Sequence, residues 1–102
     1  MTTVAGAITQ ELIYQVAYET NKRAAITVPQ DGLTAFGEAF QRETKPMAHF
    51  ILGQILENSK LAIADSRPMC GDTGLPRYYL KVGNEARIEG GFVALERSLR
   101  QA

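Results

Sequence analysis

The segment from Pro46 to Asp65 limits the possible folds of this chain most strongly, because it holds one unbroken helical pattern of about 20 residues. Its apolar side chains recur at helical spacing and form one broad stripe, made of Met47, Phe50, Ile51, Ile55 and Ala62 and widened by Leu52, Leu56 and Ile63. A stripe this wide indicates burial against more than one partner. We therefore predict a helix over residues 46–65, roughly 30 Å long.

Two further helical patterns precede this segment. In the first, apolar residues recur from Ile8 to Ala17, and Thr9 is suited to cap the amino end of the helix. The second is expected to begin at Pro29, a residue that suits the first helical position. Leu33 and Phe40 then fall on one face. The amino-terminal two thirds of the chain should thus form a bundle of about three helices.

The pattern changes after Asp65. Prolines and glycines crowd residues 66–76 and predict a loop. Alternation of apolar side chains over residues 78–82 predicts a strand, Gly83 begins a turn, and Ile88 is placed on a short second strand. An apolar stripe from Phe92 onward predicts a terminal helix. The expected fold class is α+β: the helical bundle, then the loop, one or two short strands and the last helix.

Charge and composition exclude several classes of partner. The 102 residues include 11 basic and 11 acidic side chains, so no basic surface for nucleic acid is expected. No apolar run approaches the roughly 18 residues of a membrane span, and the first residues do not resemble a signal peptide. A single cysteine cannot form an internal disulfide. We expect a one-domain cytoplasmic protein with no membrane partner.

The predicted loop carries the residues best suited to chemistry. Cys70 lies beside Gly71, where a thiolate could be reached by backbone N–H groups and by a soft metal, and Asp72 follows two residues later. Gly71 and Gly74 allow backbone angles that other residues resist, and they allow the close approach of a ligand. From the residues alone, two simpler interpretations stay open. A lone cysteine is more often a small buried hydrophobe, and the residues from Asp72 to Gly74 could form a plain turn.

A wider stretch of sequence carries a family resemblance. The sequence reads ILENSKLAIA at 55–64, RPMCGDTG at 67–74 and YLKVG at 79–83. These segments closely resemble the part of Fe-S-dependent hydro-lyases, namely class I fumarases and tartrate dehydratase alpha subunits, that introduces the first cluster cysteine. The family pattern there is a helix, then Arg-Pro-x-Cys-Gln-Asp-Thr-Gly, then a strand ending in Lys-x-Gly. The resemblance extends less sharply back to Pro29.

This resemblance implies a function and a cofactor. Members of the family add or remove water on a small dicarboxylate, and three of their cysteines hold a [4Fe-4S] cluster with one open iron. By resemblance, Cys70 is the first cluster ligand and Asp72 assists proton transfer. Arg67 and Thr73 match positions that could contact substrate. Residues 1–102 would then be the amino-terminal part of the alpha-type catalytic domain, with the rest of that domain, a beta-type domain or subunit and further copies of the chain as partners.

The chain departs from the family pattern in two ways. Gly71 stands where the family has a glutamine that resembles a substrate contact, so that contact must be lost or supplied elsewhere. The other two cluster cysteines are absent from the 102 residues. We therefore expect this chain alone to hold no cluster and to be inactive.

Two other functions, and other roles for two further residues, also fit parts of the sequence. The triplet that begins at Asp72 also occurs in aspartic proteases, but those enzymes are nearly all strand, whereas helical patterns dominate here. A non-catalytic helical interaction module derived from the same family is the second rival. His49 is better suited to a helix surface or to packing between helices than to binding metal. Arg77, like Arg67, could hold a carboxylate or simply brace the loop.

Overall fold

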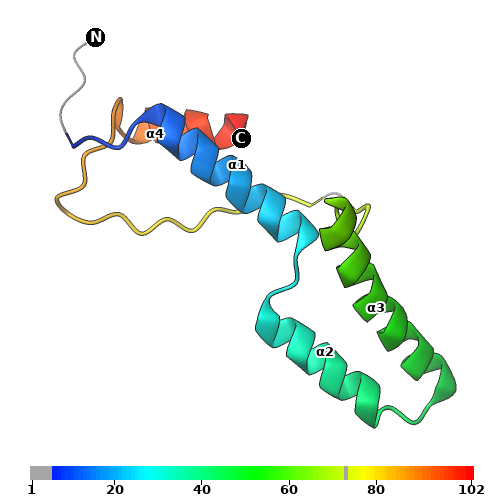
Figure 1. Ribbon diagram of the computed structural model, residues 1–102. Coiled ribbons are helices and arrows are strands. Elements are labelled where there is room, and N and C mark those ends of the chain that lie inside the picture. Colours follow the sequence, from blue (N-terminus) through cyan, green and yellow to red (C-terminus); the bar gives the residue numbers. More distant parts are fainter. Residues whose placement is uncertain (1–5, 73) are drawn as a thin grey trace. The chain divides into compact units, whose positions relative to one another are not determined.

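The computed structural model describes residues 6–72 and 74–102, and over these residues the ordered elements are four helices (Figure 1). They are α1 (Gln10–Ile26), α2 (Gln30–Arg42), α3 (Pro46–Asp65) and α4 (Gly91–Gln101). The chain divides into two compact units. The first comprises Met1–Lys22 and Gly74–Ala102, and the second comprises Arg23–Thr73. Helix α1 begins in the first unit, and its last turn belongs to the second.

The second unit is a helical hairpin in which α2 packs against α3 (Figure 1). The prediction for α3 is confirmed at both ends, with Pro46 at its first position. Helix α2 begins one residue later than expected, at Gln30, because Pro29 occupies the capping position. Where the two helices meet, the ring of Phe40 stacks on that of His49, with 4.0 Å between the ring centroids.

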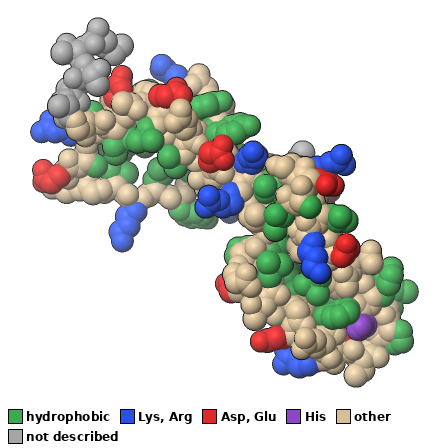
Figure 2. Space-filling view, in the orientation of Figure 1, with side chains coloured by type: hydrophobic (Ala, Val, Ile, Leu, Met, Phe, Trp, Pro, Cys, Tyr) green, Lys and Arg blue, Asp and Glu red, His purple; other side chains and the backbone are tan. Residues whose placement is uncertain are grey.

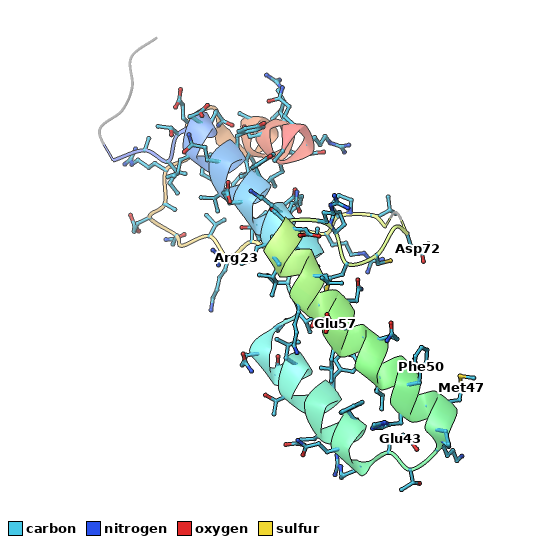
Figure 3. All side chains as sticks on the ribbon, turned by 45° about the vertical axis from the view of Figure 1, so that its right-hand side comes forward. Arg23, Glu43, Met47, Phe50, Glu57 and Asp72 are labelled. Carbon is cyan, nitrogen blue, oxygen red and sulfur yellow. The ribbon has the colours of Figure 1, made fainter. Side chains whose placement is uncertain are left out.

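The apolar stripe of α3 is only partly covered by this packing. Of the helix's own residues, only Ser59 and Ala62 are buried. Met47 and Phe50 are 70% and 62% exposed and point away from α2 (Figure 3). Apolar side chains accordingly gather on the visible surface of the hairpin (Figure 2). Burial against more than one partner, which the width of the stripe predicts, is thus not completed within this unit.

The first unit joins the start of α1 to α4 through a few long-range contacts. Thr9 caps α1 as expected, because its Oγ1 accepts a hydrogen bond from the Leu12 N–H at 3.2 Å. The Gln10 side chain donates to the Glu89 carbonyl and accepts a hydrogen bond from the Ser98 hydroxyl. These bonds connect the two ends of the described chain and bring Ile13 and Leu95 into a small apolar core.

The predicted α+β class is wrong, because residues 6–72 and 74–102 contain no strand. The segment 78–82 runs without helix or turn, but it has no neighbouring strand with which to form a ladder. Its alternation does not give a clearly covered side either: Tyr78 is half-buried, but Leu80 and Val82 are 54% and 40% exposed. A strand also requires a backbone partner, which alternation alone does not report.

The second predicted strand reduces to one isolated bridge. Ile8 and Ile88 pair in parallel, with Ile8 N–H donating to the Arg87 carbonyl at 2.8 Å and Glu89 N–H donating to the Ile8 carbonyl at 3.0 Å. The turn predicted at Gly83 is confirmed, because its carbonyl accepts a hydrogen bond from the Ala86 N–H at 3.0 Å. None of the helices in the described ranges is long and apolar enough to span a membrane.

Candidate functional site

The loop that carries Cys70, residues 66–72, begins where α3 ends in a Schellman motif. Ser66 adopts the left-handed conformation, with φ at 52°, and its N–H donates to the Ile63 carbonyl at 3.3 Å. The Arg67 N–H then donates to the Ala62 carbonyl at 3.0 Å. Pro68 follows and cannot continue a helix. The end of α3 is therefore set by its own backbone, and the chain leaves it in a defined direction.

Met69 is held on both sides of its backbone. Its N–H donates to the Ala25 carbonyl at 3.0 Å, and its carbonyl accepts a hydrogen bond from the Asn58 Nδ2 at 2.7 Å. Ala25 lies in the last turn of α1, where helix carbonyls lack partners within their own helix. Asn58 lies on α3. We call this pair of bonds the Met69 clasp, and it lies entirely within the second unit.

Cys70 follows the clasp directly and is exposed, so the interpretation as a small buried hydrophobe is wrong. The Asp72 N–H donates to the Cys70 Sγ at 3.3 Å, which orients the sulfur toward the backbone of its own loop. The Asp72 side chain is exposed and projects from the loop (Figure 3). The structure thus places the predicted metal ligand and the predicted catalytic carboxylate two residues apart on one exposed stretch of loop, accessible to a ligand.

For the other residues of the predicted site, the structure gives little support. Arg67 is exposed, and within the described ranges its side chain forms no ion pair. Thr73 lies outside the described residues. Gly71 does not use the backbone freedom that glycine allows, because its φ is not positive, and the left-handed residue at the start of the loop is Ser66. A Cβ built at Gly71 meets no atom within 4 Å, so this glycine is not required by crowding.

The residues present fit only part of an iron–sulfur site. One thiol can supply one thiolate ligand, whereas a cluster with one open iron needs three. Across the described parts of the chain, no group of three or more His, Cys, Asp or Glu side chains is arranged to hold a metal ion. Cys70 is therefore compatible with one ligand position of such a cluster, and the described residues do not complete the site.

Two minor candidates have packing roles. His49 stacks on Phe40 between α2 and α3, which confirms the prediction of an interhelical histidine. The Tyr78 hydroxyl accepts a hydrogen bond from the Asn21 side chain and donates to the Leu99 carbonyl at 3.5 Å, so this side chain braces the first unit.

Arg77 is exposed. The protease hypothesis is not supported, because a helix rather than an apolar strand leads toward Asp72.

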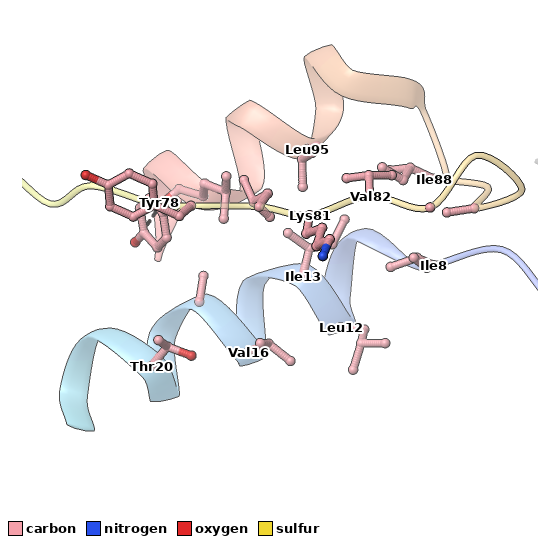
Figure 4. Close-up of a pocket in the computed structure, with 16 residues that line it drawn as sticks. Ile8, Leu12, Ile13, Val16, Thr20, Tyr78, Lys81, Val82, Ile88 and Leu95 are labelled. Carbon is pink, nitrogen blue, oxygen red and sulfur yellow. Dashed lines mark hydrogen bonds between the residues drawn. The ribbon is translucent and has the colours of Figure 1, made fainter. Parts of the chain in front are cut away.

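Sequence reasoning missed an apolar pocket in the first unit, with a volume of about 510 Å³ (Figure 4). It is formed by α1, α4 and the extended segment between Tyr78 and Gly83. Leu12 and Val16, which belong to the apolar pattern of α1, line it. The sequence holds the apolar stripes of α1 and α4 that line the pocket. Neither stripe, however, indicates that the space between these elements stays open.

Residues 14–102 match the model of the family described as fumarate hydratase (Fumerase). The chain belongs to this family. It is 38% identical over 71 residues to a Methanocaldococcus jannaschii protein with the provisional name L(+)-tartrate dehydratase subunit alpha, a match that covers 70% of this chain and 25% of that protein.

A second relative gives a similar match. It is a Geobacillus stearothermophilus protein with the provisional name fumarate hydratase class I, 36% identical over 73 residues, which are 71% of this chain and 14% of that protein. The chain thus spans a quarter or less of the length of these two relatives. No solved structure matches it.

Proposed function

We propose that this chain is the amino-terminal part of a hydro-lyase that reversibly adds water to, or removes it from, a small dicarboxylate such as fumarate, malate or tartrate. Membership of the fumarate hydratase family supports the reaction class. The two relatives are named for fumarate hydration and tartrate dehydration, which are both exchanges of water on a four-carbon diacid. Because the two names give different substrates, the proposal covers only the reaction that they share, the addition or removal of water.

The observation that carries this proposal is the pairing of Cys70 and Asp72 on one exposed stretch of loop, joined by the bond from the Asp72 N–H to the Cys70 sulfur. A soft ligand beside a carboxylate suits a site where metal and proton chemistry act on the same substrate. Cys70 would be one of three thiolate ligands of a [4Fe-4S] cluster, with the other two supplied by the rest of the protein. When bound, such a cluster supplies a Lewis-acidic iron.

The residues of this chain have distinct proposed roles. Asp72 assists transfer of the proton at the carbon next to the one that bears the hydroxyl group. Arg67, whose guanidinium is exposed beside the loop, pairs with a substrate carboxylate. Thr73 donates a hydroxyl hydrogen bond to substrate. At Gly71 there is no side chain to replace the family glutamine, so the corresponding contact comes from another part of the protein.

The proposal includes an assembly. The remainder of the alpha-type domain and a beta-type domain or subunit would complete the site, in a cytoplasmic homo-oligomer. The 102 residues alone would then hold no stable cluster after anaerobic reconstitution and would show no hydratase activity. The alternative, a non-catalytic interaction module of the same family, predicts that the full-length protein is inactive as well.

Two substitutions in the full-length protein test the proposal. Cys70→Ala should abolish the visible absorbance of the cluster together with the activity. Asp72→Asn should leave the cluster bound and lower the rate by about 10²–10⁴-fold, the usual contribution of a group that assists proton transfer. Asp65→Asn, at the end of α3, is the matched control and should change neither.

The outcomes separate the assignments. A normal cluster in Cys70→Ala would remove this loop from the metal site. Full activity in Asp72→Asn would reduce the aspartate to a turn residue. The interaction module would be favoured if the full-length wild-type protein bound no cluster and had no activity on fumarate, malate or tartrate.

A further inference from the structure

We infer that Asn58 is a positioning residue that sets the location of Cys70 through the Met69 clasp. This inference rests on the proposed role of Cys70 for its functional meaning. Its physical basis is independent of that role, because both bonds of the clasp are made by residues of the second unit. No assignment drawn from the sequence pattern includes Asn58 among the functional residues.

The clasp acts on Cys70 through the planarity of the peptide bond. The carbonyl of Met69 and the N–H of Cys70 belong to one rigid plane, which also contains the Cys70 Cα. A bond from Asn58 Nδ2 to that carbonyl at 2.7 Å therefore fixes the plane from which the cysteine projects. On the other side of Met69, the bond from its N–H to the Ala25 carbonyl holds the preceding plane.

Only a few rotations then remain for the sulfur. With the plane before Cys70 fixed, the position of Sγ depends only on the torsions φ and χ1 of Cys70. The bond from the Asp72 N–H to Sγ at 3.3 Å restricts these torsions. The thiol is thus located relative to α3 by a short series of contacts, of which the Asn58 amide supplies the only side-chain donor.

The position of Asn58 in α3 supports this role. Asparagine is a poor helix former, because its side chain competes with the backbone for hydrogen bonds. Its neighbour Ser59 is buried and bonds within the helix, to the Leu56 carbonyl at 2.7 Å. Asn58 instead reaches across to a loop residue 11 positions later. Asn58 itself is exposed, and its bond to the Met69 carbonyl lies on the surface, where it ties the helix to the cysteine loop.

The test compares three variants at position 58 in the full-length protein. Asn58→Asp keeps the shape but removes the donor, Asn58→Ala removes the side chain while improving helix propensity, and Asn58→Gln retains a donor on a longer side chain. Gln54→Ala, one turn earlier on the exposed side of the same helix, is the control. Circular dichroism establishes that each variant keeps its helices.

Two measurements on the cluster-free protein test the clasp itself. Amide hydrogen exchange in the peptide that covers residues 67–72 should accelerate about fivefold in Asn58→Asp and Asn58→Ala, as expected for loss of one ordinary hydrogen bond. Peptide-resolved alkylation of Cys70 by iodoacetamide should change in the same variants. Asn58→Gln should recover part of both effects, and Gln54→Ala should match the wild type. Unchanged exchange and unchanged labelling in correctly folded Asn58→Asp would overturn the inference.

A spectroscopic measurement connects the clasp to the proposed cluster. In the loaded enzyme, Asn58→Asp should keep the cluster but shift or broaden the electron paramagnetic resonance signal of its reduced form, because one ligand is less well located. An unaltered signal, despite faster exchange, would show that the clasp does not act on the site. Failure of the proposed function is distinguishable, since it would appear as a retained cluster in Cys70→Ala while the exchange result at Asn58 still stands.

Discussion

A Cβ at Gly53 would lie 3.2 Å from Cε2 of Phe40, so the close packing of α2 on α3 depends on a position without a side chain. This contact lies where the Phe40 ring also stacks on His49. A helix interior is otherwise a poor place for glycine, which costs roughly 0.5–1 kcal/mol relative to alanine there. Close approach of the two helices explains why the residue stands at this point.

We expect Gly53→Val to destabilise the hairpin by about 1–3 kcal/mol, because the added methyl groups overpack the space that Phe40 fills. Urea unfolding followed by circular dichroism measures the change. Gly37→Ala is the matched control: its Cβ meets no atom within 4 Å, so it should stabilise α2 by about 0.5–1 kcal/mol. Equal effects of the two substitutions would contradict the packing role of Gly53.

The turn before α4 supplies a second prediction. Gly90 has φ at 75°, and a Cβ there would lie 2.7 Å from the Cβ of Ala94. Gly90→Ala should therefore lower the stability of the first unit by at least about 1–2 kcal/mol, the cost of a left-handed alanine before the steric overlap is added. Thermal unfolding provides the measurement. The control is Gly83→Ala, where φ is not positive and no atom lies within 4 Å; a drop of the same size there would refute the explanation.

Restoring the family residue at position 71 gives a third prediction. The space around Gly71 is open and its φ is not positive, so Gly71→Gln should change the free energy of unfolding by less than about 0.5 kcal/mol. In the full-length protein, the same substitution should alter KM for the dicarboxylate, because an amide is added beside the proposed site. A large loss of stability would indicate that the loop excludes side chains at this position.

The exposed face of α3 gives a fourth prediction. Met47 and Phe50 are largely exposed on a helix whose first eleven residues carry no Asp, Glu, Lys or Arg. We expect the 102-residue chain to self-associate through this surface, because apolar area gains free energy when it is removed from water. Sedimentation velocity should show concentration-dependent association that Phe50→Glu reduces. Gln54→Glu adds the same charge on the same helix and should have a smaller effect; a monomer at high concentration would rule the idea out.

Helix positions could be predicted from the sequence because the deciding interactions are local. The limits of α3, the cap at Thr9 and the turn at Gly83 all depend on residues a few positions apart. The strand at 78–82 could not be decided in this way. Alternation of residue types is a local pattern, while pairing depends on whether another segment lies alongside, which no local pattern records.

For the candidate site, sequence reasoning proposed Cys70 and Asp72 but not what holds them. The left-handed residue at the start of the loop is Ser66, whose conformation follows from the end of α3. Asn58 was missed because its partner is a backbone carbonyl, and a carbonyl leaves no trace in the residue pattern. Backbone acceptors of this kind are visible only once the chain is folded.

The division of the chain has a consequence for the order of folding. The first unit is discontinuous in sequence, and the bonds that join its parts connect residues 79 and 88 positions apart. Bringing such distant residues together carries an entropic cost that grows with the length of free chain between them. Formation of the second unit ties Ala25 to Met69 and so removes about half of that length. The inserted hairpin, whose own contacts are local, should therefore form first and act as a tether that speeds assembly of the unit into which it is inserted.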